Sequence, residues 1–229
     1  MDKVIFWDFH GTLANNDWMF SKALYKVLYK YEPNCGFNID NIKKQLITGF
    51  PWQEPEKEYI HLTHPDVWWE HIYKIFVKVY TCMDITEEKA GMYAKEVRYE
   101  LIQPDEYILY EDTIETLNFF KNKGFSNIIL SNHIPELPEI AKQIGLAECI
   151  DGCISSANVG FEKPNSRIYE YALKISNYPS ETWMVGDSII ADVKGAEGAG
   201  IKGVLVRSPK EGDVKCYSKD LRGLKDIIR

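Results

Sequence analysis

The sequence predicts a doubly wound α/β fold with an inserted helical segment, and three observations support this. Short apolar runs that end in turn residues alternate with helical patterns in the second half of the chain, which is typical of βαβ units around a parallel sheet. A similar apolar run lies at the start of the chain. The intervening region has helical patterns and few strand-like runs. We therefore expect a Rossmann-like α/β core of residues 1–14 and 106–229, with a helical cap of residues 15–105.

The predicted strands are apolar runs, each stopped by polar or turn residues. Runs that are apolar at successive positions, without alternation, indicate strands buried on both faces of a parallel sheet. In chain order these strands are Val4–Trp7, Ser126–Leu130, a weaker candidate over Cys149–Ser155, Thr182–Val185 and Lys202–Val206.

The predicted helices of the core show apolar residues at intervals of three and four, and glycines follow the first two helices. They cover Thr113–Lys123, Pro138–Ile144, Asn165–Ile175 and Asp192–Ala199. In the cap, helical patterns cover Trp18–Tyr31, Asp66–Tyr80 and Thr86–Leu101, and prolines mark a broken stretch over Phe50–Pro65.

The cap is rich in aromatic residues, with 16 of them in 91 residues against 14 in the remaining 138. Aromatic residues at helical spacing most often pack inside a helix bundle, so we expect Trp18, Trp68, Trp69 and Tyr73 in the cap core. Trp52 lies in the proline-rich stretch, and it is the best candidate among the cap aromatics to face a substrate.

Composition narrows the classes of protein and partner. The 229 residues carry a net charge of −7, which argues against a nucleic-acid binder that relies on a basic field. No run approaches the roughly 20 apolar residues of a membrane span. The five cysteines include no C-x-x-C pair, which favours free thiols in a reducing compartment. We expect a cytoplasmic protein without nucleic-acid or membrane partners, and composition leaves its oligomeric state open.

Polar side chains stand where the predicted strands end. Asp8, Ser131 and Asp187 each follow an apolar run, and the carboxyl ends of parallel strands meet at one edge of a sheet. Lys163 lies in a loop that opens the next helix and can join them. Two carboxylates repel each other unless a cation lies between them, so Asp8, Asp187 and nearby Asp192 form an oxygen site suited to Mg²⁺.

The remaining groups suit an anion. A serine hydroxyl, a lysine ammonium and loop amides together make a cradle for a phosphoryl group. A metal site, an anion cradle and an inward-pointing carboxylate suggest phosphoryl transfer to Asp8, with an aspartyl phosphate that water then hydrolyses.

Four motifs, in order, resemble those of the haloacid dehalogenase-like (HAD) superfamily, in the subgroup with a helical cap inserted after the first motif. They are Asp8-Phe9-His10-Gly11-Thr12-Leu13, then Leu130-Ser131-Asn132, then Lys163-Pro164 preceded by Ser155-Ser156, and finally Gly186-Asp187 with Asp192 five residues beyond Asp187. The resemblance covers the predicted core, and the position of the insertion matches the helical cap of that subgroup.

The resemblance implies a role for each motif residue. Asp8 would be the nucleophile and a Mg²⁺ ligand, together with the backbone carbonyl of His10 and with Asp187. Asp192 would hold a metal-bound water. The phosphoryl group would be bound by the following three groups: Ser131, the amide of Asn132, and Lys163.

The sequence departs from the family pattern at His10, where the phosphatases and mutases carry a second aspartate that moves protons. Histidine can give and take a proton near neutral pH, so His10 is a candidate acid/base residue. A purely structural role for His10 stays open, and His133 may be read either as a substrate contact or as a structural residue. Dehalogenase-type members also lack the second aspartate, but the retention of Asp187 and Asp192 weighs against that class.

The expected function is hydrolysis of a small phosphomonoester by a Mg²⁺-dependent phosphatase. The net negative charge argues against a polyanionic substrate, so the partner is expected to be a small phosphorylated metabolite. A phosphomutase, a Mg²⁺-independent carbon–halogen hydrolase and a catalytically impaired phosphate-binding protein remain alternatives. The residues do not name the substrate.

Overall fold

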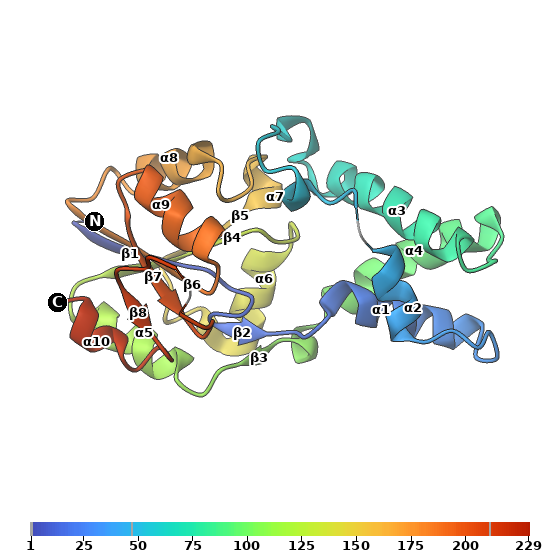
Figure 1. The fold of residues 1–229 in the computed structure, drawn as a ribbon, viewed down its shortest axis with the longest axis horizontal. Coiled ribbons are helices and arrows are strands. Elements are labelled where there is room, and N and C mark those ends of the chain that lie inside the picture. Colours follow the sequence, from blue (N-terminus) through green and yellow to red (C-terminus); the bar gives the residue numbers. More distant parts are fainter. Residues whose placement is uncertain (1, 47, 211) are drawn as a thin grey trace.

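The structure is a computed structural model that describes residues 2–46, 48–210 and 212–229. Its main sheet is six-stranded, with the strand order β5-β4-β1-β6-β7-β8, and every neighbouring pair is parallel. The predicted parallel α/β fold is therefore confirmed (Figure 1). The strands are β1 (Lys3–Trp7), β4 (Ser126–Ser131), β5 (Gly152–Ser155), β6 (Glu181–Gly186), β7 (Lys202–Val206) and β8 (Tyr217–Ser218).

Strand β1 lies in the middle of the sheet and is buried on both faces. Val4 and Phe6 pack on one face with apolar residues of the helices α8 (Ser166–Ile175) and α9 (Gly195–Gly198). Ile5 and Trp7 pack on the other face with residues of α5 (Thr113–Asn122) and α6 (Leu137–Ala141). The chain runs to β4 on one side of β1 and to β6 on the other, so the strand order reverses there. In parallel sheets such a reversal opens a crevice beyond the carboxyl ends of the strands.

The helices of the core follow the predicted pattern with local differences, and the two short helices α7 (Ser156–Val159) and α10 (Leu224–Ile227) were not expected. Helix α6 passes into a π-helical turn, in which Gly145 has a φ of 93°. The last predicted helix begins earlier, at Ile189, because the Ser188 side chain accepts the amide of Ala191. The helices are α5 (Thr113–Asn122), α6 (Leu137–Ala141), η4 (Lys142–Leu146), α7 (Ser156–Val159), α8 (Ser166–Ile175), η5 (Ile189–Lys194), α9 (Gly195–Gly198) and α10 (Leu224–Ile227).

Residues 15–105, called the helical insertion below, form a helical layer beside the sheet (Figure 1). Trp68 and Trp69 are buried in it, as the sequence predicts. One helix, Ile39–Gln45, was not expected, because it is short and begins at a side-chain cap on Asn38. The elements are α1 (Met19–Tyr31), α2 (Ile39–Gln45), η1 (Pro51–Gln53), η2 (Ile60–Leu62), α3 (Pro65–Thr81), α4 (Glu87–Leu101) and η3 (Pro104–Glu106).

The helical insertion is joined to the sheet through a small antiparallel pair of strands. β2 (Ala14–Asn15) leaves the core and β3 (Ile108–Leu109) returns to it. Side chains also cross between the two parts, since Glu136 of the core accepts hydrogen bonds from Trp69 at 2.9 Å and from Arg98 at 2.9 Å. No described helix is long and apolar enough to cross a bilayer.

The buried side chain of Asn127 on β4 connects β1, α5 and the segment before β5 through hydrogen bonds. It accepts a hydrogen bond from Trp7 Nε1 at 3.0 Å and donates to the carbonyls of Leu117 and Cys149, each at 2.9 Å. Asn127→Ala leaves these groups unpaired, so we expect the free energy of unfolding to fall by about 3 kcal/mol. Urea denaturation measures this. The exposed Asn122→Ala is the matched control, and equal stability of the two variants would contradict the assignment.

Candidate active site

The predicted site residues meet at the carboxyl edge of the sheet. Asp8 follows β1, and its amide donates to the carbonyl of Val185 on the neighbouring β6 at 2.9 Å. Its Oδ1 accepts hydrogen bonds from Ser131 Oγ and from Lys163 Nζ, both at 2.8 Å. No described residue donates a hydrogen bond to the second oxygen, Oδ2. One carboxylate oxygen of Asp8 is thus held in place while the other stays available.

Lys163 joins two of the carboxylates. Its Nζ lies 2.8 Å from Asp8 Oδ1 and 2.5 Å from Asp192 Oδ1, and the side chain is almost fully buried. Burial by itself lowers the pKa of Lys163, but Asp192 and Asp8 together raise it above the usual value. The ammonium is therefore a permanent positive charge within this cluster.

The loop that carries Lys163 is held to the loop after β4 by a reciprocal pair of hydrogen bonds. The Lys163 amide donates to Asn132 Oδ1 at 2.7 Å, and Asn132 Nδ2 donates to the Lys163 carbonyl at 2.9 Å. The structure therefore uses the Asn132 side chain to place the lysine. The expected role of Asn132, in which its backbone amide binds the phosphoryl group, stays a prediction.

Three carboxylates form a cluster that could hold a metal ion. Oxygen atoms of Asp8, Asp187 and Asp192 all lie within 4.8 Å of one another. Burial, together with the charges of Asp8 and Asp192, raises the pKa of Asp187 to about 7. A hard divalent cation would relieve this repulsion, and carboxylate oxygens are the ligands that Mg²⁺ prefers. The donor set therefore fits Mg²⁺.

Two glycines of the motifs allow the carboxylates to approach the backbone. A Cβ at Gly11 would lie 2.5 Å from Asp187 Oδ2, and Gly11 also has a φ of +83°, which favours glycine. A Cβ at Gly186 would lie 2.1 Å from the carboxyl carbon of Asp192. The second oxygen of Asp192 accepts the amide of Ser188 at 2.9 Å. Sequence reasoning did not single out Gly186 or Ser188, although the motif spacing contains both.

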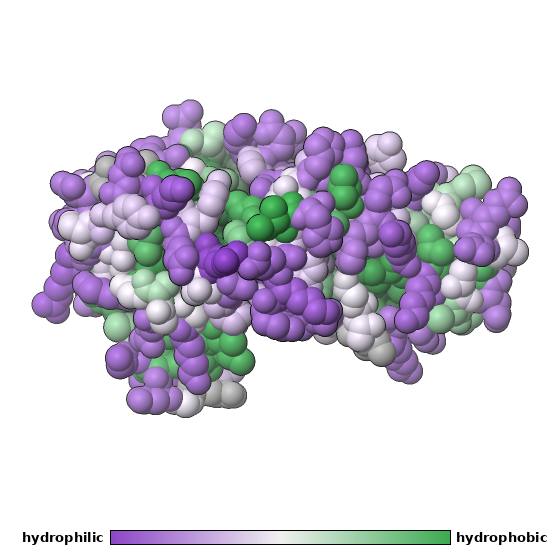
Figure 2. Space-filling view, turned by 90° about the horizontal axis from the view of Figure 1, so that it is seen from above, coloured by the Kyte–Doolittle hydropathy of each residue, from purple (hydrophilic) through white to green (hydrophobic). Residues whose placement is uncertain are grey.

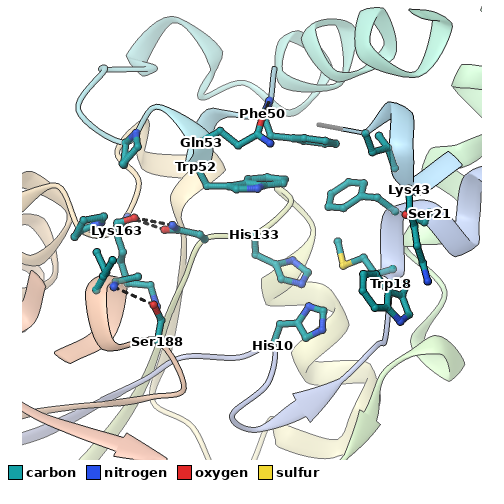
Figure 3. A pocket seen from close by; sticks show the side chains of 18 residues that line it. His10, Trp18, Ser21, Lys43, Phe50, Trp52, Gln53, His133, Lys163 and Ser188 are labelled. Atoms are coloured by element: carbon teal, nitrogen blue, oxygen red, sulfur yellow. Dashed lines mark hydrogen bonds between the residues drawn. The ribbon is translucent and has the colours of Figure 1, made fainter. Parts of the chain in front are cut away.

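The side chains of His10 and His133 lie next to each other at the floor of a cavity (Figure 3). Burial lowers the pKa of His10 from its usual value, although Asp8 and Asp17 oppose the shift. Burial, followed by the charge of His10, lowers the pKa of His133 to about 3. Neither ring nitrogen of His133 has a hydrogen-bond partner among the described residues. His133 is therefore a neutral ring at physiological pH.

The cavity has a volume of about 720 Å³ and lies between the core and the helical insertion. The core contributes His10, Asn132 and Lys163, and Lys163 connects the cavity to Asp8 and Asp192 of the carboxylate cluster. Figure 2 shows apolar side chains gathered between the two parts of the molecule on an otherwise largely hydrophilic face. Trp52 lines the cavity, as the sequence suggested.

Trp18 corrects one expectation. It was predicted in the core of the helical insertion, but it is 63% exposed and lines the cavity. The physical reason is local, because Trp18 precedes α1 with a left-handed φ of 60° and so does not share the buried stripe of that helix. Phe20 and Phe50, which also line the cavity, were not singled out.

Comparisons with known proteins identify the family of this chain. A sequence profile of the haloacid dehalogenase-like hydrolase family matches residues 3–200, and the chain belongs to that family. Among curated relatives, a glyceraldehyde 3-phosphate phosphatase of Methanothermobacter thermautotrophicus is 35% identical over 114 residues, which are 49% of this chain and 48% of that protein. A phosphoserine phosphatase of Thermus thermophilus is 33% identical over 118 residues, 51% and 47% of the two chains. The chain thus spans about half the length of these relatives.

Solved structures share the whole fold. A HAD-hydrolase of Bacillus subtilis bound to magnesium has a TM-score of 0.74 at 18% identity, with 99% of this chain and 98% of that chain covered. A HAD phosphatase of Thermococcus onnurineus has a TM-score of 0.67 at 22% identity, with 99% and 97% covered. These likenesses cover the helical insertion as well as the core.

The unpaired, buried ring of His133 predicts a loss of stability in acid. The unfolded chain takes up a proton at this residue below a pH near 6.5, whereas the folded chain does so only near 3. Because the unfolded state then binds more protons, this residue lowers the free energy of unfolding by about 2 kcal/mol when the pH falls to about 5. His133→Leu should lose that much less than the wild type between pH 7.5 and about 5 in urea denaturation. His64→Leu, at an exposed position, should lose as much as the wild type, and a similar loss in His133→Leu would contradict this account.

Proposed function

We propose that the protein is a Mg²⁺-dependent phosphohydrolase that acts on a small phosphomonoester through an aspartyl phosphate on Asp8. The observation that carries the proposal is the unequal hydrogen bonding of the two oxygens of the Asp8 carboxylate. Ser131 and Lys163 hold Oδ1, and Oδ2 is left without a hydrogen-bond donor, beside a cavity large enough for a small substrate. Relatives that are named as phosphatases support the reaction class.

In the proposed reaction, Asp8 Oδ2 attacks phosphorus and the bond to the leaving alcohol breaks. Ser131 Oγ and Lys163 Nζ, which already contact Oδ1, would also neutralise charge on the phosphoryl oxygens. Asp192 contributes by fixing Lys163, because the 2.5 Å contact limits the positions that the ammonium can take. The amide of Asn132 is the further expected donor to the phosphoryl group.

We assign the Mg²⁺ site to Asp8, the backbone carbonyl of His10, Asp187 and Asp192. When bound, the ion would supply positive charge that draws the phosphoryl group toward Asp8 and stabilises the transition state. Asp187 fits a ligand role, since burial and the charges of Asp8 and Asp192 raise its pKa, and a bound cation would favour its charged form. Asp192 would act beyond the first ligands through a bound water, because Lys163 and the Ser188 amide hold its two oxygens.

His10 takes the proton-transfer role in this proposal. Burial favours the neutral ring of His10, and the charge of Asp8 favours the imidazolium. The protonated fraction would protonate the leaving alcohol, and the neutral ring that results would then accept a proton from the water that attacks the aspartyl phosphate, which returns His10 to its starting state. Its side chain lines the cavity two residues after Asp8 in the chain, which supports a position near the leaving group. The helical insertion would then serve as the cap over a core of residues 1–14 and 106–229.

The nucleophile is tested with p-nitrophenyl phosphate. Asp8→Asn removes the attacking carboxylate, so we expect kcat to fall by at least about a thousandfold. The assay is run with EDTA and then with added Mg²⁺, and only the second condition should give p-nitrophenol release by the wild type. Asp226→Asn, exposed on α10, is the matched control. If Asp8→Asn released p-nitrophenol as fast as the wild type, the nucleophile assignment would be wrong. Full activity of the wild type in EDTA would contradict the metal assignment.

The proton-transfer role is tested by His10→Ala. Positioned acid/base groups contribute about a hundredfold or more, so kcat at neutral pH should fall by that factor while the affinity for the product phosphate stays the same. His10→Asp, which restores the usual residue of the family, should recover most of the rate. His64→Ala, at an exposed histidine, serves as the control. An unchanged kcat in His10→Ala would refute the role.

A further inference from the structure

The wall of the cavity that faces the carboxylate cluster is built from aromatic rings of the helical insertion. Phe50 and Trp52 are stacked, with ring centroids 4.6 Å apart and planes 17° apart. Phe20 of α1 packs against both, at 4.9 Å from Phe50 and 5.5 Å from Trp52. We call these three residues the aromatic wall. Since Phe50 covers one face of Trp52, only the opposite face of the indole is left for a ligand.

The aromatic wall is rigidly held. Pro51 opens the short helical turn η1, and the amide of Phe50 donates to Gln53 Oε1 at 3.0 Å, which closes that turn. Phe76 of α3 lies behind Phe20 at a centroid distance of 6.2 Å. In Figure 3 the Trp52 ring lies between Phe50 and the space above His133. The open face of the Trp52 ring is therefore directed across the cavity toward the imidazole rings of His133 and His10.

The charged groups that line the cavity are few, and Ser21 and Gln53 are neutral polar residues on the side of the insertion. None of the described side chains that line it is acidic, and the helical insertion contributes one charged group, Lys43. That ammonium is already engaged, because it lies 3.7 Å from the centre of the Trp18 ring and 3.4 Å from Asp40. A leaving group with a carboxylate or an ammonium would lose its hydration there without gaining an ion pair, which is costly.

We propose that the leaving group of the substrate carries a flat aromatic ring, which lies between the open face of Trp52 and the His10–His133 floor. This inference deepens the proposed function and rests on it for the position of the phosphoryl group. Aromatic rings that meet at 4.5–7 Å are stabilised beyond the area they bury, so a flat ring would gain from stacking on the open indole face and from contact with the imidazoles. The observations thus favour an aryl-bearing phosphomonoester over one with a charged or zwitterionic leaving group.

Binding and turnover are measured separately, so that failure of this inference can be told from failure of the proposed function. Three phosphonates, which cannot be hydrolysed, are titrated by calorimetry in the presence of Mg²⁺. They carry phenylpropyl, cyclohexylpropyl and propyl groups. We expect the phenyl compound to bind about three- to tenfold more tightly than the cyclohexyl compound, which is similar in size but not flat. The propyl compound should bind most weakly.

Trp52→Leu should remove the preference for phenyl over cyclohexyl, and Trp52→Phe should keep most of it. Neither change should alter the affinity for the propyl compound by more than about twofold, because that compound does not reach the ring. Tyr29→Leu, an exposed aromatic outside the cavity on α1, is the matched control. Trp18→Ala, at a position that is 63% exposed, gives a second variant whose folding does not depend on the ring.

Equal affinity of the wild type for the phenyl and cyclohexyl compounds would overturn the inference, and so would an unchanged preference in folded Trp52→Leu. Turnover of 2-phenylethyl phosphate and of glycerol phosphate is then compared, since both release an alkyl alcohol. Higher kcat/KM for the phenyl ester supports the inference, and equal values count against it. If neither ester nor p-nitrophenyl phosphate is hydrolysed while the phenyl phosphonate still binds preferentially, the proposed function fails and the aromatic subsite stands.

Discussion

The buried ion pairs of Lys163 are the interaction on which the rest of the site depends. An ammonium removed from water is costly unless it is paired, and here it contacts Asp8, in the loop after β1, and Asp192, in η5 after β6. The same lysine is tied through its backbone to Asn132, from the loop after a third strand. Loss of the ammonium would leave two buried carboxylates without compensation. One side chain thus links the ends of β1, β4 and β6.

This arrangement explains why the cluster keeps a strong attraction for cations. One ammonium faces three carboxylates, and the close approach of Asp187 is made possible by the missing side chain at Gly11. The excess negative charge lies in the carboxylate cluster that Lys163 contacts, whereas the aromatic wall of the cavity carries no charged side chain. The cavity therefore separates an ionic half from an apolar half. In an acidic protein, local groups rather than the overall field decide what binds.

The sequence predicted the charged and polar residues at the strand ends well, but it did not predict the aromatic wall. The two sets of residues are positioned by different kinds of interaction, which explains the difference. Asp8, Ser131 and Asp187 could be placed because parallel strands bring their carboxyl ends to one edge, whatever the details of packing. The aromatic wall depends on how helices and a proline-rich turn pack against each other, which no local pattern encodes. Trp18 shows the limit, since its position before the first turn of α1 decided its exposure. Strands of two residues, such as β2 and β8, are too short to leave a periodic signal.

The β2–β3 pair has a consequence for how such a protein can change. The pairs Ala14–Leu109 and Asn15–Ile108 bring the two ends of the helical insertion side by side. The insertion therefore leaves the core and returns to it at one place, as a long loop between two strands would. The groups assigned to phosphoryl chemistry all belong to the core, and the aromatic wall belongs entirely to the insertion. Substitutions on the cavity side of the insertion can therefore change what is bound while the groups of the core stay the same, provided that contacts such as those of Glu136 with Trp69 and Arg98 are kept. The β2–β3 pair is therefore a position at which one helical insertion could be replaced by another, so that substrate recognition changes while the residues of the reaction centre stay the same.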